Sequence, residues 1–290
     1  MRIDAHQHFW HFNESEYDWN ADDQKILRQD YLPGHLEYYL RDNGLEGTIA
    51  VQARQSLIEN DYLIQLAQSN SFVKGIVGWL DLQSDELSVN LEKYQGKLCG
   101  LRHIIHDETE VDFMLQDEFV RGIGKLNSSG FTYDLLVRPE HLGNCIALID
   151  RFPDQQFVID HLAKPSIATG TMSPWQEDIT RLAERQNVYC KLSGMVTEAD
   201  YSAWGEEELP LNDFLPYMDV VLEAFSADRL MYGSDWPVCT LACTYDEVYD
   251  IVSEYIIKLS NDEQAQIMGE TATNFYGLQS SDLQSTGTTK

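Results

Sequence analysis

The sequence predicts a single-domain (β/α)8 barrel, and three observations carry this prediction. The 290 residues are long for one ordinary domain but typical of one α/β barrel. Eight short apolar runs alternate with longer amphipathic segments, and the runs begin at residues 2, 47, 74, 99, 131, 157, 188 and 230. Most of the intervals hold 25 to 32 residues, which is the length of one strand, one helix and their loops.

The eight apolar runs are expected to be strands of a covered sheet, because their apolar residues are continuous rather than alternating. They span residues 2–8, 47–52, 74–80, 99–104, 131–137, 157–161, 188–193 and 230–234. Segments with helical spacing of apolar residues lie between them, at 57–69, 141–151, 175–186 and 213–225. Eight regular units favour a closed barrel over an open sheet, and no G-x-G-x-x-G follows any run to suggest a dinucleotide fold.

Domain organisation is simple, because no repeat, linker or change of composition divides the chain. We expect residues 1–279 to form the barrel, with longer loops at 13–29 and 197–211. The second of these loops carries an acidic run at 206–208 and could act as a lid, although the run itself is typical of a solvated surface. The last residues, 280–290, are polar and low in complexity, and we expect them to be disordered.

Composition excludes several classes of partner. The formal net charge is −28, from 48 acidic and 20 basic residues, and such a surface repels nucleic acid and anionic membranes. The five cysteines are odd in number and scattered, which is not typical of a disulfide framework. The opening MRIDAHQHFW has no signal-peptide pattern. A cytoplasmic enzyme is therefore expected, and its oligomeric state stays open.

Four ionisable side chains end three of the predicted strands, and in such barrels the chemistry lies at these carboxyl ends. They are His6, His8, His161 and Asp235. His6 and His8 are two residues apart, so both should face the interior. Imidazole and carboxylate are natural ligands of divalent metals, and they also serve in acid–base catalysis. One such residue would more often be a satisfied core group, but four at the same end of a barrel favour a functional site.

Five segments resemble the amidohydrolase superfamily, and within it the branch of fuconolactonase-like and rhamnonolactonase-like sugar lactonases. They read DAHQHFW at 4–10, GWLDL at 78–82, DHLAKP at 160–165, KLSGM at 191–195 and GSDWP at 233–237. The motifs occur in the order of the family and span almost the whole barrel. They are specific for the branch and less specific for the substrate.

The resemblance implies that water attacks the carbonyl of a sugar-acid lactone, such as L-fuconolactone or L-rhamnonolactone, with Asp235 as general base. It implies that His6, His8 and His161 bind a metal or polarise the carbonyl directly. One divalent ion, most simply zinc, would be held by these histidines and Asp235, and a metal-free site is the alternative. A binuclear site is not expected, because the fifth strand, FTYDLLV at 131–137, contains no histidine.

Other functions on the same barrel stay open at this point. A dicarboxylate-lactone hydrolase or a decarboxylase is the main alternative, although their carboxylate substrates call for a denser arginine cluster. A non-catalytic barrel that binds metal or sugar is the alternative from another class. The chain has a general base, groups that can polarise water and an expected open pocket, and these features disfavour a non-catalytic barrel.

Basic residues gather near the strand ends although the chain is acidic, which predicts a positive mouth for an oxygen-rich substrate. They are Arg54, Arg102, Arg138, Lys164 and Lys191. For Arg138 we expect a structural salt bridge instead. The residues expected to contact the substrate are Arg102, His103, Lys191, Arg54, Trp10 and Trp236. His106, Tyr133 and Glu198 are weaker candidates.

Overall fold

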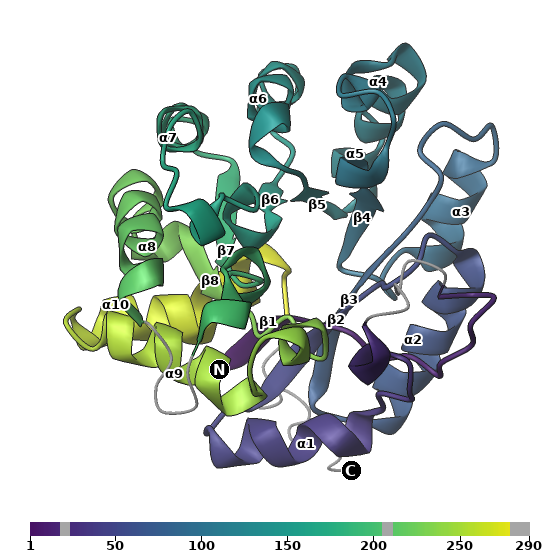
Figure 1. Cartoon of the computed structure of the whole chain (residues 1–290). Helices are drawn as coiled ribbons and strands as arrows, with labels where there is room; N and C mark the ends of the chain where they lie inside the picture. The colour runs from purple at the N-terminus through teal and green to yellow at the C-terminus, as the bar shows by residue number, and fades with distance from the viewer. Residues whose placement is uncertain (18–23, 205–210, 279–290) are drawn as a thin grey trace, which may run out of the picture.

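A computed structural model describes residues 1–17, 24–204 and 211–278, and it shows eight parallel strands in one sheet. The strands follow one another around the sheet in chain order: β1 (Ile3–Gln7), β2 (Gly47–Val51), β3 (Val73–Gly78), β4 (Gly100–Ile104), β5 (Thr132–Leu136), β6 (Phe157–Ile159), β7 (Val188–Leu192) and β8 (Leu230–Tyr232). Figure 1 shows them as an inner ring with helices outside it. The predicted (β/α)8 barrel is therefore confirmed.

The ring closes between β8 and β1 just beyond the end of β8. The backbone N–H of Asp235 donates to the carbonyl of His6 at 2.8 Å, and that of His8 donates to the carbonyl of Trp236 at 2.7 Å. The pairing of β1 with β2 shifts register between Asp4 and Gln7. The strand that carries both predicted histidines thus meets the segment that carries Asp235, as the closed topology requires.

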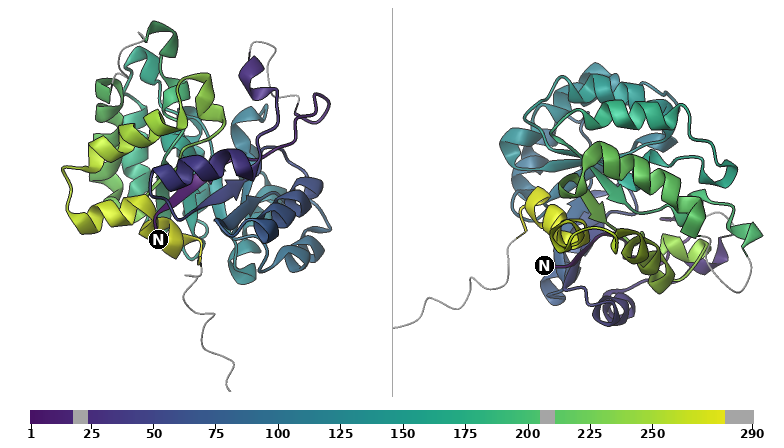
Figure 2. Two further views of the ribbon diagram at one scale, coloured as in Figure 1. Left: turned by 90° about the horizontal axis from the view of Figure 1, so that it is seen from below. Right: turned by 90° about the vertical axis from the view of Figure 1, so that its left-hand side faces the viewer.

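Helices cover the outside of the barrel (Figures 1 and 2). Those between the strands are α1 (Pro33–Asp42), α2 (Leu57–Ser69), α3 (Leu87–Tyr94), α4 (Asp117–Ile123), α5 (Leu126–Ser129), α6 (Leu142–Ile149), α7 (Trp175–Ala183) and α8 (Leu211–Phe225). After β8 come α9 (Tyr245–Ile256), α10 (Asn261–Ala265) and α11 (Thr271–Phe275). No helix among the described residues is long and apolar enough to cross a membrane.

The barrel interior is apolar at its amino-terminal end. Ile3, Ala5, Ile49, Val158 and Met231 belong to one buried cluster that also includes Phe275 and Tyr276, from the last described segment of the chain. In both views of Figure 2 the N-terminus lies beside this yellow C-terminal segment. The segment after β8 therefore closes the floor of the barrel and leaves the carboxyl ends of the strands for the site.

Two expectations lie outside the described residues: the disordered tail at 280–290 and the acidic run at 206–208. The same holds for the middle of the two loops that were expected to be long, 13–29 and 197–211.

Candidate active site

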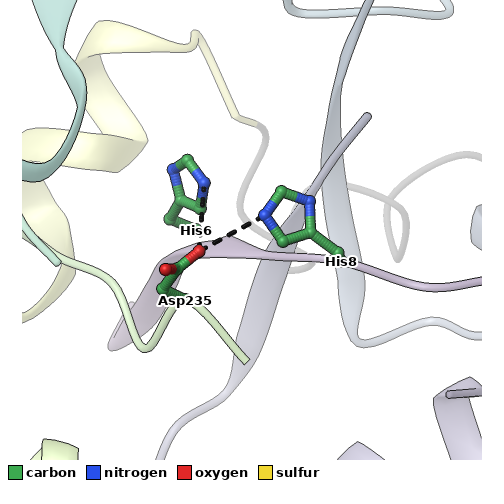
Figure 3. A group of neighbouring side chains, drawn as sticks. All are labelled: His6, His8 and Asp235. Atoms are coloured by element: carbon green, nitrogen blue, oxygen red, sulfur yellow. Dashed lines mark ion pairs between the residues drawn. The ribbon is translucent and has the colours of Figure 1, made fainter. Parts of the chain in front are cut away.

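Four side chains from three strand ends meet at the carboxyl-terminal mouth of the barrel. The Asp235 Oδ1 atom lies 3.3 Å from His8 Nε2, 3.7 Å from His6 Nε2 and 3.9 Å from His161 Nε2. Figure 3 shows the imidazoles of His6 and His8 directed at this carboxylate. All four residues are buried, with 5% or less of each exposed. The Asp235 carboxylate is thus a common neighbour of the three imidazoles, and His6, His8 and Asp235 lie close enough together to hold a single ion.

A local network of hydrogen bonds fixes the backbone that presents Asp235. The Asp4 carboxylate accepts the Ser234 backbone N–H at 2.9 Å and its hydroxyl at 2.6 Å, and the Ser234 hydroxyl accepts the Trp236 N–H at 3.0 Å. Asp235 adopts φ +57°, in the left-handed region, where Asp is among the tolerated residues. A Cβ on Gly233 would come within 2.6 Å of the His6 Cβ, so this glycine lets β8 approach the imidazole.

His161 also lies on unusual backbone, at φ +55° in a run of left-handed residues that continues to Lys164. Its Nδ1 is 2.8 Å from the Ser193 hydroxyl. A Cβ at Gly194 would lie 2.4 Å from that same Nδ1, so a larger residue there would displace the ring. The KLSGM segment thus holds His161 in place through Ser193 and Gly194.

The donor set fits a bound cation. The Nδ1 atom of His8 lies 2.8 Å from the Val51 carbonyl, which can only accept, so Nδ1 carries the proton. In a neutral imidazole the Nε2 lone pair then faces the Asp235 carboxylate at 3.3 Å. A cation bound between these two atoms would interact favourably with both of them. His6, His8 and Asp235 form a group that could hold a metal ion, and tetrahedral ligands at about 2.0–2.1 Å lie roughly 3.3 Å apart.

A second group of charges lies directly beneath these residues, inside the barrel. Lys191 Nζ contacts Asp134 Oδ2 at 2.6 Å, Asp160 Oδ1 at 3.0 Å and His6 Nδ1 at 3.1 Å. Arg102 contacts Asp160 Oδ2 at 3.0 Å and His6 Nε2 at 3.2 Å through the same nitrogen. Two cations and two carboxylates therefore balance, and His6 lies between the two cations.

Burial and neighbouring charges set the protonation states. Burial lowers the pKa of His6 and of His161 well below the usual histidine value, so both rings are neutral near pH 7. Burial raises the pKa of Asp235, but His161 and the contact with His8 outweigh it, and the pKa lies below its ordinary value. Burial lowers the pKa of Lys191, but Asp134 and Asp160 outweigh it, so the amine stays charged.

A cavity of about 390 Å³ opens above the cluster. Asp235, His8, His161 and Arg102 lie on its wall, and loops after the strands supply most of the other lining residues. Leu27, Val238 and Leu241 contribute apolar surface, whereas His106, Arg138, Lys164 and Glu198 contribute polar surface. The volume and the mixed lining suit a small polar ligand that has one apolar edge.

The charges at this mouth are mostly paired. Lys164 bonds Glu198 at 2.6 Å, and Arg54 bonds Glu59 at 2.7 Å. Arg138 was expected to form a structural salt bridge, but among the described residues no ion pair involves it, and it lines the cavity. Arg138 therefore presents a guanidinium group to the cavity and forms no ion pair with a described carboxylate.

The residues expected to contact a substrate fall into two groups. Arg102 lines the cavity, but the other five do not. Lys191 is fully buried in the charge group below, Trp10 and Trp236 are at most 3% exposed, and Arg54 is held by acidic neighbours. His103 stacks on Phe113 and bonds Glu108. These five side chains therefore lie outside the lining of the cavity, and their contact with a substrate stays a prediction.

Sequence reasoning underrated or missed several residues of the site. His106 lines the cavity, and burial together with the nearby Lys164 lowers its pKa to about 3. Asp160 binds Arg102 and Lys191, although only its neighbour His161 was singled out. Asp134 and Lys191 were visible as charged residues inside apolar runs, and this was the signal that could have paired them. Asp4 and Ser193 gave no comparable signal beyond their place in the motifs.

Comparisons with known proteins identify the family of the chain. A sequence profile described as amidohydrolase matches residues 3–278. An L-fucono-1,5-lactonase from Burkholderia multivorans is 37% identical, and one from Burkholderia ambifaria is 33% identical, each over 96% of both chains. A crystal structure of an amidohydrolase from Burkholderia multivorans with bound zinc is 36% identical and has a TM-score of 0.92. It covers 96% of this chain and 100% of its own. The predicted enzyme family is thus confirmed: the chain belongs to the amidohydrolase family.

Proposed function

We propose that this enzyme hydrolyses a sugar-acid lactone of the L-fuconolactone type to the open hydroxy acid. The observation that carries the proposal is the convergence of three imidazoles on the Asp235 carboxylate at the floor of a cavity of about 390 Å³. Relatives named L-fucono-1,5-lactonase match the whole barrel at 33–37% identity, which supports this substrate class. L-Rhamnonolactone, another 6-deoxy lactone, is the second substrate to test.

The proposed steps use this chain's own residues. Asp235 accepts a proton from the attacking water, and a new bond forms between the water oxygen and the lactone carbonyl carbon. Where no ion is bound, Arg102 and His161 offer N–H donors from the cavity wall to the carbonyl oxygen as it gains negative charge, and a well-placed donor contributes roughly 3–4 kcal/mol. The ring C–O bond then breaks, and Asp235 returns the proton to the leaving oxygen.

A divalent ion, with zinc first among the candidates, would be held by His6, His8, His161 and Asp235. When bound, such an ion lowers the pKa of a coordinated water to about 7. This help matters because Asp235 has a pKa below its ordinary value and is a weak base for bulk water. Arg102 is the residue that competes with the ion, because its guanidinium already lies 3.2 Å from His6 Nε2.

Dialysis against a chelator separates the two mechanisms. If the ion activates the water, kcat falls after dialysis and returns with one equivalent of zinc, as measured alongside metal analysis. If the rate is unchanged in protein shown to be free of metal, Arg102 and His161 polarise the carbonyl without help.

The direct test of the function is a pH-indicator screen over aldonolactones, since each turnover releases one proton at neutral pH. We expect acid release from L-fuconolactone, and we expect Asp235→Asn to lower kcat by roughly 10²–10⁴-fold with little loss of stability. The matched control is Asp107→Asn, which changes another acidic residue of the same cavity. Release of carbon dioxide from an aromatic acid, with no lactone cleaved, would favour the decarboxylase alternative.

A further inference from the structure

The last described segment of the chain reaches the charge group beneath the active site. Tyr276 follows α11, is 5% exposed and packs with the apolar residues that close the barrel floor. Its hydroxyl donates to Asp134 Oδ2 at 2.7 Å, and its ring lies 5.6 Å from Lys191 Nζ. A residue near the end of the chain thus enters the centre of the barrel from the face opposite the cavity.

A continuous set of buried contacts joins Tyr276 to the active site. Asp134 Oδ2 accepts the Tyr276 hydroxyl and also the Lys191 ammonium, at 2.6 Å. The two other contacts of that ammonium are with Asp160 and His6. Hydrogen bonds to Asp134 and His6 use two of the three donors of this lysine, and Asp160 Oδ1 forms an ion pair with the same nitrogen. A movement of Asp134 that shifts the Lys191 ammonium therefore also changes its distance from the imidazole of His6.

His6 is sensitive to that position because it lies between two donors. Lys191 approaches Nδ1 at 3.1 Å and Arg102 approaches Nε2 at 3.2 Å. A neutral imidazole has only one nitrogen that can accept, so it cannot accept from both cations at once. A small shift of Lys191 therefore changes which contact is satisfied, and with it the orientation of the ring toward Asp235.

We propose that Tyr276 is a positioning residue for the hydrolysis proposed above, because it holds Lys191 through Asp134 and so fixes the imidazole of His6. We call this series of contacts, from Tyr276 through Asp134 and Lys191 to His6, the relay. A single oxygen of Asp134 connects its first two steps. Among the described residues its Oδ1 has no hydrogen-bond partner, so Oδ2 carries both the tyrosine and the lysine. Without the phenol hydroxyl, only the lysine holds this carboxylate, and both side chains gain freedom to move.

The chain contains a matched control for this tyrosine. Tyr255 donates to Asp219 Oδ1 at 2.8 Å, and Lys258 bonds the same oxygen at 3.0 Å. The Tyr255 ring is also buried, at 2% exposed, and also lies close to the ammonium. This group joins α8 and α9 in the outer layer, and none of its residues lines the cavity. Tyr255→Phe removes the same hydrogen bond without touching the relay.

The experiment compares Tyr276→Phe with Tyr255→Phe in the full-length enzyme. We expect Tyr276→Phe to lower kcat about tenfold and to leave KM within twofold, because Tyr276 does not line the cavity. Tyr255→Phe should leave both constants within twofold. The imidazole ¹⁵N signals of His6, recorded without substrate, should shift in the first variant and not in the second.

Each other outcome has a defined meaning. Unchanged kcat together with unchanged His6 signals in Tyr276→Phe overturns the proposal, and so does an equal loss of kcat in Tyr255→Phe. If Tyr276→Phe does not fold, Asp134→Asn takes its place with the same expected loss of kcat, and failure of both to fold assigns the segment to stability alone. If the wild type cleaves no lactone, the proposed function fails, but the His6 signals still decide the relay.

Discussion

Two clusters in this molecule use the same three residue types in the same arrangement. The central cluster consists of Asp134, Lys191 and Tyr276, and the surface cluster of Asp219, Lys258 and Tyr255. In each, a phenol hydroxyl and an ammonium meet at one carboxylate oxygen, at 2.7 and 2.6 Å in the centre and at 2.8 and 3.0 Å on the surface. The contacts are nearly equal, so any difference in behaviour comes from the surroundings.

The surroundings reverse the effect on the carboxylate. Burial raises the pKa of Asp134 to about 6, against the opposing effect of Lys191. At Asp219 partial burial also raises the pKa, but the hydrogen bonds from Lys258 and Tyr255 outweigh it, and the pKa lies below its ordinary value. The Asp219 and Lys258 side chains are 59% and 51% exposed, whereas those of Asp134 and Lys191 are fully buried. Hydrogen-bond distances alone therefore do not determine whether the environment of a carboxyl group raises or lowers its pKa.

The largest expected difference between the clusters comes from removing the lysine. Lys191→Met leaves Asp134 and Asp160 buried without their shared cation, and breaking a buried pair costs about 3–5 kcal/mol of unfolding free energy. Lys258→Met removes an exposed pair, for which about 0–1 kcal/mol is typical. Urea denaturation of both variants measures the difference. Equal losses would contradict the view that burial separates the two clusters.

The sequence supported the fold well because the barrel repeats one local pattern eight times. Continuous apolar runs with regular spacing were enough to predict the strands and their parallel order. Closure of the barrel then placed the end of β8 beside β1, and so brought Asp235 to His6 and His8. Residues that end strands were therefore predictable, since the topology itself brings those ends together.

Residues beside the strand ends were harder to assign. Arg102 and His103 were both expected at the substrate, yet neighbours in a strand face opposite sides. Arg102 faces the barrel interior, and His103 packs outward against Phe113. The turn Ile105–Asp107 then returns His106 to the cavity, which no periodicity within the strand could indicate.

The central cluster could not be predicted, because its members come from β5, β7 and the segment after α11. These elements are distant in the sequence, and β5 and β7 are not neighbours in the sheet. Asp134 and Lys191 stood out as charges in apolar runs, but Tyr276 belongs to no motif. Only the three-dimensional structure shows that Tyr276, just after α11, reaches the centre of the barrel.

The two clusters should also differ, to a smaller extent, in how their contributions to stability depend on pH. The pKa of Asp134 is higher in the folded protein than the ordinary value of 3.8, so the folded state binds this proton more tightly than the unfolded state does. The contribution of Asp134 to stability therefore falls as pH rises from about 4 to about 6, and it stays low above that. The difference between 3.8 and about 6 corresponds to about 2–3 kcal/mol. Asp219 has the opposite sign, because its stabilising contribution is present above the unfolded pKa and is lost as pH falls through the folded one.

Two variants, Asp134→Asn and Asp219→Asn, isolate the pH-dependent contributions of these two residues to stability. Each variant is compared with the wild type by chemical denaturation between pH 4 and 7. The buried Asp4, whose pKa burial also raises to about 6, is present in every protein compared, so its contribution cancels. The stability of the wild type relative to Asp134→Asn should decrease as pH rises through this range. Relative to Asp219→Asn it should stay level and decrease only toward the acid end. If both differences run in the same direction, Lys191 and Tyr276 compensate fully for the burial of Asp134, and the distinction between the two clusters fails.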